Sequence, residues 1–250
     1  MVPPSLLIAF AFVIGCCFGS FGNVLVMRVG AGKSLRGRSQ CPHCKSTLQW
    51  YDLVPIVSFC LLRGRCRRCH ASIAVRYILM EVIMGSLFVF ALMLSQYEPW
   101  HAMALMILLF ALLLIVVFDI HYQAIPDSFT AIVFLGALLW QGAEGPSVGS
   151  VLGALTAFLW FGIQWLPGRG KYVGSGDIFL AASLGVWLEW RGTVLMLFLS
   201  YIVGMIVCGY LLLTRRIALH GTRIPFAPFL AIGAVVSFLI VEDVWRYLLG

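Results

Sequence analysis

Charged residues are scarce in this sequence. Asp, Glu, Lys and Arg together make up 11% of its 250 residues, whereas 62% are hydrophobic. A water-soluble domain of this length has too little interior to hide so much apolar surface. The scarcity excludes a soluble globular domain, a disordered chain and a secreted disulfide scaffold, and the net charge of +7 does not indicate a nucleic-acid partner.

Long hydrophobic runs fill most of the chain. A run of about 18 or more apolar residues crosses the hydrocarbon core of a bilayer as a helix. The shortest runs here are expected to pack closely or to extend into adjacent loops. The runs predict an all-α polytopic membrane protein with about eight transmembrane helices, at residues 5–27, 77–95, 101–118, 128–141, 148–166, 178–190, 193–213 and 226–243.

The first run has no basic segment before it. A cleavable signal peptide needs such a segment and a short apolar core, whereas this run continues unbroken through residues 5–27. We therefore expect a retained helix. The predicted organisation is a first transmembrane helix at 1–27, a loop at 28–76 and a transmembrane domain at 77–250.

The basic residues assign the two sides of the membrane, because Lys and Arg accumulate in short cytoplasmic loops. Ten of the 17 lie between Arg28 and Arg76. With alternating spans, only Arg191 and Arg246 lie on the opposite side. This pattern predicts that both termini are outside and that the 28–76 loop is cytoplasmic. Five more basic residues then join the cytoplasmic side: Arg169, Lys171, Arg215, Arg216 and Arg223.

Four of the eight cysteines form two CxxC pairs in the 28–76 loop, Cys41 with Cys44 and Cys66 with Cys69. Each pair can present two thiolates to one tetrahedral ion, and this spacing is typical of a four-cysteine zinc site. A pair of disulfides is the alternative, but structural disulfides are rare in the reducing cytoplasm. The sequence therefore predicts a structural Zn²⁺ site.

A second motif, GAGKS at 30–34, is similar to the end of a phosphate-binding loop. The full pattern needs a glycine where Met27 stands, with a strand before it and a helix after it. Here a predicted membrane span precedes the motif and a basic loop follows it. We therefore expect no nucleotide binding at this motif.

Two of the ten acidic residues, Asp119 and Asp177, stand at the ends of apolar runs. Asp119 ends LMILLFALLLIVVFD, and Asp177 follows Gly174, Ser175 and Gly176. The predicted topology places both near the cytoplasmic membrane surface. Ionisable groups at such depth are costly and are often functional, although helix capping and ion pairing are commoner roles.

Two carboxyl groups in one poorly solvated site cannot both ionise cheaply, so such a pair holds one shared proton near neutral pH. Aspartic proteases use this state: the ionised carboxyl takes a proton from the attacking water, and the protonated one acts as an acid. Asp119 and Asp177 are therefore candidate catalytic residues. The alternative is a non-catalytic transport or assembly protein in which they relay protons or hold helices together.

Six motifs in order carry a resemblance that covers nearly the whole chain. They are GSFGNVLVMR at 19–28, CPHC followed by LQWYDLVPIVSF, RGRCRRC followed by IAVRYILMEVI, FDIHYQAIPD at 118–127, GSGD at 174–177 and IPFAPFLAIGA at 224–234. With them, the sequence resembles the bacterial type IV prepilin peptidases, which are membrane aspartic proteases with a GxGD motif.

The resemblance implies that Asp119 and Asp177 are the catalytic aspartates. It implies cleavage of basic leader peptides from type IV prepilins or type II secretion pseudopilins, at the cytoplasmic face of the bacterial inner membrane. Many relatives with the four-cysteine loop also methylate the new N-terminus with S-adenosylmethionine, so we expect this second activity. A peptidase without methylation is the alternative. The expected partners are these substrates and the lipid bilayer.

Four residues depart from the family pattern. Phe179 stands where relatives often carry a basic residue, and Ala227 lies in an element that usually reads PFGP. Ile78 replaces a common proline and Asp52 a glutamate, in or beside the expected methylation region. Gly64 is a candidate contributor to methylation or an ordinary turn glycine. None of the departures removes a candidate catalytic group.

Overall fold

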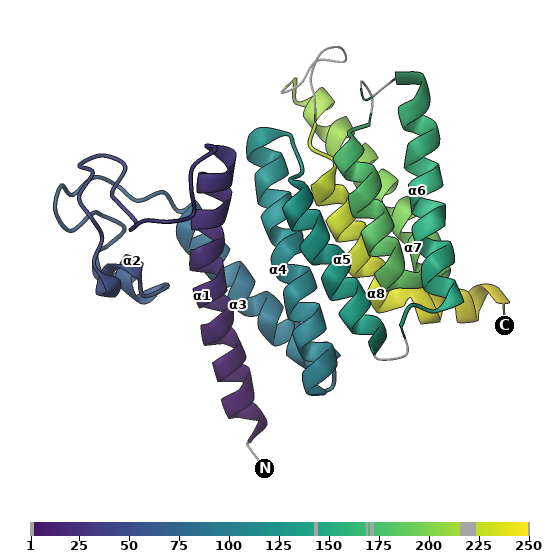
Figure 1. Ribbon diagram of the computed structural model, residues 1–250, viewed down its shortest axis with the longest axis horizontal. Coiled ribbons are helices and arrows are strands. Elements are labelled where there is room, and N and C mark those ends of the chain that lie inside the picture. Colours follow the sequence, from purple (N-terminus) through teal and green to yellow (C-terminus); the bar gives the residue numbers. More distant parts are fainter. Residues whose placement is uncertain (1–2, 143–144, 169, 171–172, 216–223, 250) are drawn as a thin grey trace. The chain divides into compact units, whose positions relative to one another are not determined.

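A computed structural model of the chain describes residues 3–142, 145–168, 170, 173–215 and 224–249. Within these ranges the regular structure is helical, with two isolated β-bridges and no longer strand. The chain forms two compact units, Met1–Phe110 and Ala111–Gly250. The helices, shown in Figure 1, are α1 (Pro4–Gly30), the 3₁₀ helix η1 (Trp50–Leu53), α2 (Val57–Leu61), α3 (Arg76–Leu94), α4 (Pro99–Tyr122), α5 (Asp127–Gln141), α6 (Val148–Gly168), α7 (Ser175–Leu213) and α8 (Ala227–Leu249).

The long helices confirm the predicted class of an all-α membrane protein. Six of the described helices are long and apolar enough to span a bilayer, and α5 is a shorter apolar helix. The predicted spans at 178–190 and 193–213 both fall in α7, which has 39 residues. A straight helix of that length would measure about 58 Å, well beyond a hydrocarbon core of about 30 Å.

α7 does not run straight, because Glu189 has non-helical φ and ψ angles of 56° and 179°. The contacts between α6 and α7 show the direction of the chain on either side of Glu189. Phe158 of α6 meets Phe179 in the first half of α7, and Gly153 faces Gly185 and Glu189. Further along α6, Trp160 donates a hydrogen bond to Tyr201 in the second half of α7.

α6 therefore runs antiparallel to the first half of α7 and parallel to the second, so the chain reverses direction at Glu189. The described helices thus supply eight helical segments for the eight predicted spans, with α5 and the first half of α7 the shortest of them. Figure 1 shows the two halves of α7 beside α6.

The packing of α5 and α8 against α7 brings the starts of three helices of the second unit to one end. Ile125, before α5, contacts Gly176 at the start of α7, and Gln141 donates to the Val186 carbonyl at the other end. α5 is therefore parallel to the first half of α7. Ser237 of α8 donates to the Gly192 carbonyl, and Phe229 packs on Gly204, so α8 is antiparallel to the second half. The starts of α5, α7 and α8 consequently lie at one end of this unit.

In the first unit, α1 and α3 pack as a close antiparallel pair. A Cβ atom on Gly15 would lie 2.7 Å from the Gly85 Cα, and one on Gly19 would lie 2.7 Å from the Glu81 Cα. Two glycines four residues apart let helix backbones approach closely in a membrane. The pair holds the ends of the 28–76 loop side by side, because Asn23 near the end of α1 donates to the carbonyl of Tyr77 in α3.

Candidate functional site

Asp119 lies in the last turn of α4, which extends past the predicted end of this span at residue 118. Its side chain is buried, and its Oδ2 accepts a hydrogen bond from the Ala227 N–H at 3.0 Å. Ala227 is the first residue of α8. The first N–H groups of a helix have no partner within the helix and favour a carboxylate. The start of α8 therefore fixes one oxygen of Asp119.

Asp177 is held by the start of another helix. It is the third residue of α7 and is half-buried, and its Oδ2 accepts a hydrogen bond from the Gly174 N–H at 3.2 Å. The starts of α7 and α8 lie at one end of the second unit, so the structure places there both of the aspartates that the sequence singled out. In each of them, the backbone hydrogen bond engages Oδ2.

The two glycines of GSGD are explained by close contacts on either side of Asp177. A Cβ atom on Gly174 would lie 3.1 Å from Asp177 Oδ2, and one on Gly176 would lie 2.7 Å from the Ile125 Cβ. Gly174 therefore leaves room for the carboxylate that folds back on it. Gly176 lets the start of α7 approach the segment before α5.

Replacing Gly176 with Ala is expected to destabilise the protein by about 1–3 kcal/mol, because the added methyl group overlaps a Cβ that is fixed to backbone. The matched control is Gly162→Ala in α6, where a Cβ would meet no atom within 4 Å. The midpoint of thermal unfolding in detergent measures both. Equal midpoints for the two variants would show that the contact with Ile125 relaxes without cost.

Two departures from the family pattern lie at this end of the unit. Ala227 is fully buried, but it contributes its backbone N–H to Asp119, so a side chain in place of glycine does not remove the donor. Phe179 is 54% exposed, one turn or less from Asp177. The exposed ring gives the surface beside Asp177 an apolar character.

The four predicted zinc ligands form a compact cluster in the loop between α1 and α3. All four sulfur atoms lie within 4.8 Å of one another, and those of Cys41 and Cys69 are 3.8 Å apart. Four sulfurs around a zinc ion at about 2.3 Å stand about 3.8 Å apart. The cysteines are free thiols, so the cluster fits one tetrahedral ion and not a pair of disulfides.

The two halves of the cluster have the same fold, which no sequence repeat indicated. Backbone hydrogen bonds join Cys41 N to Ser46 O and Leu48 N to Ser39 O, and the same bonds recur 25 positions later. Each half also contains one antiparallel β-bridge at the same position. The bridge joins Gln40 to Thr47 in the first half and Arg65 to Ser72 in the second. Segments 39–48 and 64–73 are therefore two copies of one metal-binding turn.

The residue after each CxxC explains why the repeat is hard to see. Lys45 and His70 both have positive φ angles, of 57° and 55°. This conformation closes the turn, but the two side chains share no chemistry. The first position is Ser39 in one copy and Gly64 in the other. Gly64 has a φ of 67° and lies against the Phe59 ring. The two copies share their backbone geometry, but the two cysteines are the only residues that are identical in both.

The thiols differ in acidity. The Ser46 hydroxyl, 3.0 Å from the Cys44 sulfur, and the Ser46 backbone lower the pKa of Cys44 to about 6. At Cys69, a backbone hydrogen bond from Ala71 lowers the pKa, but loss of water and the neighbouring cysteines outweigh it and raise the pKa to about 11. The cluster therefore contains a thiol, Cys44, that loses its proton more readily than an ordinary cysteine.

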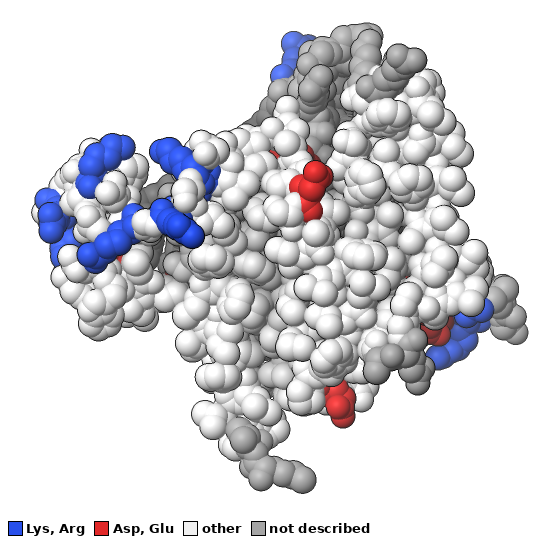
Figure 2. Space-filling model, viewed as in Figure 1, with Lys and Arg blue, Asp and Glu red and all other residues white. Residues whose placement is uncertain are grey.

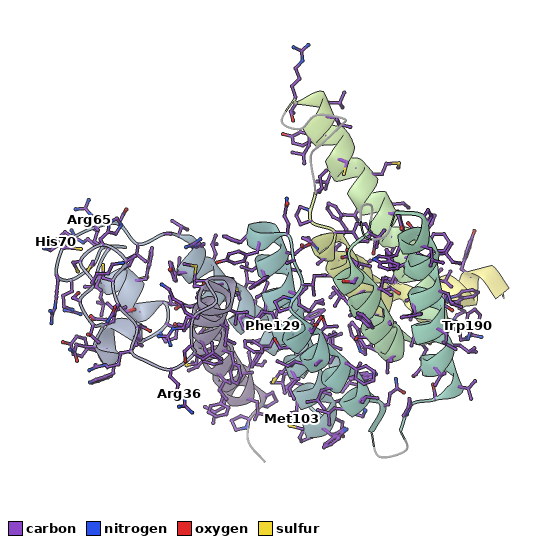
Figure 3. All side chains as sticks on the ribbon, turned by 45° about the horizontal axis from the view of Figure 1, so that its top comes forward. Arg36, Arg65, His70, Met103, Phe129 and Trp190 are labelled. Atoms are coloured by element: carbon purple, nitrogen blue, oxygen red, sulfur yellow. The ribbon has the colours of Figure 1, made fainter. Side chains whose placement is uncertain are left out.

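Basic residues surround the cysteine cluster. Figure 2 shows Lys and Arg side chains gathered over the 28–76 loop, and Figure 3 places Arg65 and His70 there. Arg67 forms an ion pair with Asp52 at 2.8 Å.

In the second unit, Arg215 follows the end of α7, whereas Arg191 lies near Trp190 and Trp245 at the opposite end. Four predicted cytoplasmic residues lie outside the described ranges: Arg169, Lys171, Arg216 and Arg223.

Comparison with known proteins gives two family matches along the chain. Residues 13–95 match the Bacterial Peptidase A24 N-terminal domain, and residues 106–209 match the Type IV leader peptidase family. No solved structure matches the chain significantly.

Individual relatives match over nearly their full length. A prepilin leader peptidase/N-methyltransferase of Stutzerimonas stutzeri is 32% identical, over 92% of this chain and 89% of the relative. One of Burkholderia pseudomallei (strain 1026b) is 34% identical, over 94% and 86%. A type 4 prepilin-like proteins leader peptide-processing enzyme of Escherichia coli O78:H11 is 30% identical, over 94% of both chains.

Proposed function

Since the chain belongs to the type IV leader peptidase family, we propose that it is a membrane aspartic endopeptidase that removes the leader peptide of type IV prepilins or type II secretion pseudopilins and then methylates the new N-terminus. The observation that carries the peptidase is the pair Asp119 and Asp177, which share one end of the second unit. Peptidase chemistry is assigned to residues 77–250, and methylation to the region of the 28–76 loop.

The aspartate pair supplies both proton transfers that peptide hydrolysis needs. The ionised carboxyl takes a proton from a water molecule while the water oxygen attacks the peptide carbonyl carbon. The protonated carboxyl gives its proton to the carbonyl oxygen, which yields a tetrahedral diol. The carboxyl that took the proton from water then gives it to the amide nitrogen, and the other carboxyl takes a proton from one hydroxyl of the diol, so the C–N bond breaks. The bonding electron pair leaves with the nitrogen, which gives a carboxylic acid and a free amine.

The backbone hydrogen bonds orient the two carboxyl groups for this task. The Ala227 N–H engages Oδ2 of Asp119, and the Gly174 N–H engages Oδ2 of Asp177. Each carboxyl thus keeps a defined direction, and its other oxygen serves the proton exchange. Fixed geometry of this kind removes part of the orientational cost of the reaction.

The charge pattern supports an active site at the cytoplasmic face. Arg215 follows the helix end that lies with Asp119 and Asp177. Trp190 and Trp245 contact each other with tilted rings at the opposite end, where Arg191 lies over both rings. Tryptophan is typical of both membrane interfaces, whereas an excess of basic residues marks the cytoplasmic one. Fifteen of the 17 basic residues fall on this side when the spans alternate.

Zinc is the metal that the four-cysteine cluster fits best. A shell of four thiolates is closed, so it leaves no position for a substrate or water and serves structure. Cys41, Cys44, Cys66 and Cys69 would hold the ion, two from each copy of the repeated turn. The ion would fix the two copies against each other.

The second activity adds a methyl group to the amine that cleavage releases. S-adenosylmethionine supplies a methyl group bound to a positively charged sulfur. The neutral amine nitrogen donates its lone pair to the methyl carbon, and the C–S bond breaks with its electrons going to sulfur. The methylated amine then loses one proton to solvent, which leaves a neutral thioether and a secondary amine.

The proposed function is tested with inverted membrane vesicles that contain the protein. A purified precursor from the pilin-like genes of the same genome is added outside, with S-adenosylmethionine. We expect mass spectrometry to show loss of the leader and one added methyl group. Cleavage without methylation would support the peptidase activity and contradict the methyltransferase activity. An intact precursor in the presence of correctly inserted protein would contradict the proposal, and cleavage only in right-side-out vesicles would contradict the proposed face.

A further inference from the structure

A cavity of about 450 Å³ lies within the first unit, between the ends of α1 and α3 and the cysteine loop. Asn23 of α1 and Glu81 of α3 line it from the membrane side, and Asp52, Phe59 and Cys66 line it from the loop. Its volume falls within the range of small-molecule and cofactor sites, about 300–1,000 Å³. Both copies of the metal-binding turn contribute to its wall, because Cys41 also lines it.

A buried carboxylate marks the membrane side of this cavity. Glu81 is 8% exposed, and its Oε2 accepts a hydrogen bond from the Ile56 N–H at 2.8 Å. The neighbouring Asp52 is different, because its charge is paired with Arg67. Glu81 therefore presents a carboxyl group, held by a neutral donor, to the interior of the cavity.

The backbone that holds Glu81 is in an unfavourable conformation. Ile56 has φ 62° and ψ −53°, and a hydrogen bond from Val57 N to Pro55 O closes the turn around it. Positive φ is rare for a β-branched residue, and such outliers concentrate at functional sites. The turn directs the Ile56 N–H at Glu81, so this strained segment fixes the carboxylate in place.

The lining of the cavity suits a ligand of mixed character. Phe59, Leu62 and Tyr77 offer apolar and aromatic surface for a flat base. A buried carboxylate commonly accepts hydrogen bonds from ribose hydroxyls, and it favours cationic groups. Arg28 and Arg76 also line the cavity and favour a carboxylate on the ligand. A polyphosphate is disfavoured, because its charge would face Glu81.

We propose that this cavity binds S-adenosylmethionine, the methyl donor. The inference rests on the methylation part of the proposed function. The ligand has an adenosine part for the apolar wall, a cationic sulfonium and ammonium for Glu81, and a carboxylate for the arginines. The cysteine cluster then has a specific purpose, since one metal ion would hold both turns that form the loop side of the cavity.

The test is a binding measurement on the full-length, zinc-containing protein in detergent. The probe for isothermal titration calorimetry is S-adenosylhomocysteine, supplemented by radiolabelled S-adenosylmethionine in equilibrium dialysis. Glu81→Gln keeps an acceptor for the Ile56 N–H but removes the charge, and we expect at least about tenfold weaker binding of the sulfonium form. Ala74→Trp fills the cavity from an exposed lining position and is expected to abolish binding of both probes.

The matched control is Glu98→Gln, which removes an exposed carboxylate of the same unit outside the cavity lining. It should bind both probes as the wild type does. Zinc content, measured on every variant, reports whether the cysteine loop is folded. If Glu81→Gln fails to insert or loses zinc, Ala74→Trp decides the question alone.

The outcomes separate this inference from the proposed function. Wild-type affinity in Glu81→Gln and Ala74→Trp, in a protein that cleaves and methylates its substrate, would overturn the cavity and leave the proposed function standing. A wild type that cleaves but neither binds the probes nor methylates would overturn both the cavity and the second activity, with the peptidase intact. Equal affinity for ATP would overturn the assignment of the ligand.

Discussion

Replacing either Asp119 or Asp177 with Asn is expected to lower the rate of leader-peptide cleavage by at least about 10³-fold, because an amide neither takes a proton from water nor gives one to the substrate. The fold should survive. An Asn side chain has the size of Asp, and its amide oxygen can still accept the hydrogen bond from Ala227 or Gly174. The measurement is the initial cleavage rate of a purified precursor in detergent.

The matched control for these variants is Asp243→Asn. Asp243 lies on α8, is exposed, and forms a solvent-exposed ion pair with Arg246. Such pairs contribute little to stability, so this variant should cleave at the wild-type rate. Because the two aspartates act as one unit, the double variant should be no slower than the worse single variant. A single Asn variant that retained more than about a tenth of the rate would show that the reaction does not need the pair.

The cysteine cluster gives the second large effect. The purified protein is expected to contain one zinc ion per chain, and the double variant Cys41→Ser, Cys69→Ser to contain none, since each half of the shell loses one thiolate. Structural zinc contributes on the order of 10 kcal/mol to the folding of small domains. The loop at 28–76 should therefore become sensitive to trypsin, which cleaves after its many basic residues.

Elemental analysis and limited trypsin digestion measure these two effects. The double variant Cys60→Ser, Cys208→Ser is the control, because both cysteines lie outside the cluster. It should keep the zinc and the resistance to trypsin. A wild type without stoichiometric metal, or a Cys41→Ser, Cys69→Ser variant that binds as much zinc as the control, would show that the four sulfurs are not a zinc shell.

Composition and spacing predicted the helices and the cysteine cluster, because both depend on local features of the chain. A run of apolar residues determines its own helix in a bilayer, and CxxC brings its own two ligands together. The predicted spans at 178–190 and 193–213 also placed a break at residues 191–192, close to the observed reversal at Glu189.

The hydrogen-bond partners of the candidate catalytic aspartates and of Glu81 could not be predicted from the sequence, because they are backbone groups. Any residue except proline has an N–H, so nothing in the side chains of Ala227, Gly174 or Ile56 identifies them as donors. The repeated turn was missed for a related reason. Its two copies share hydrogen bonds and positive φ angles, while their side chains outside the cysteines differ.

The hydrogen bond between Ala227 and Asp119 has a consequence for biosynthesis. The two residues are separated by 108 positions, and α8 follows both aspartates in the chain. Asp119 and Asp177 both precede Ala227 in the chain, so both leave the ribosome before it does. The acid pair thus lacks one of its two backbone hydrogen-bond donors until α8 is in place. Partly synthesised molecules should therefore be unable to cut precursors that pass through the same membrane.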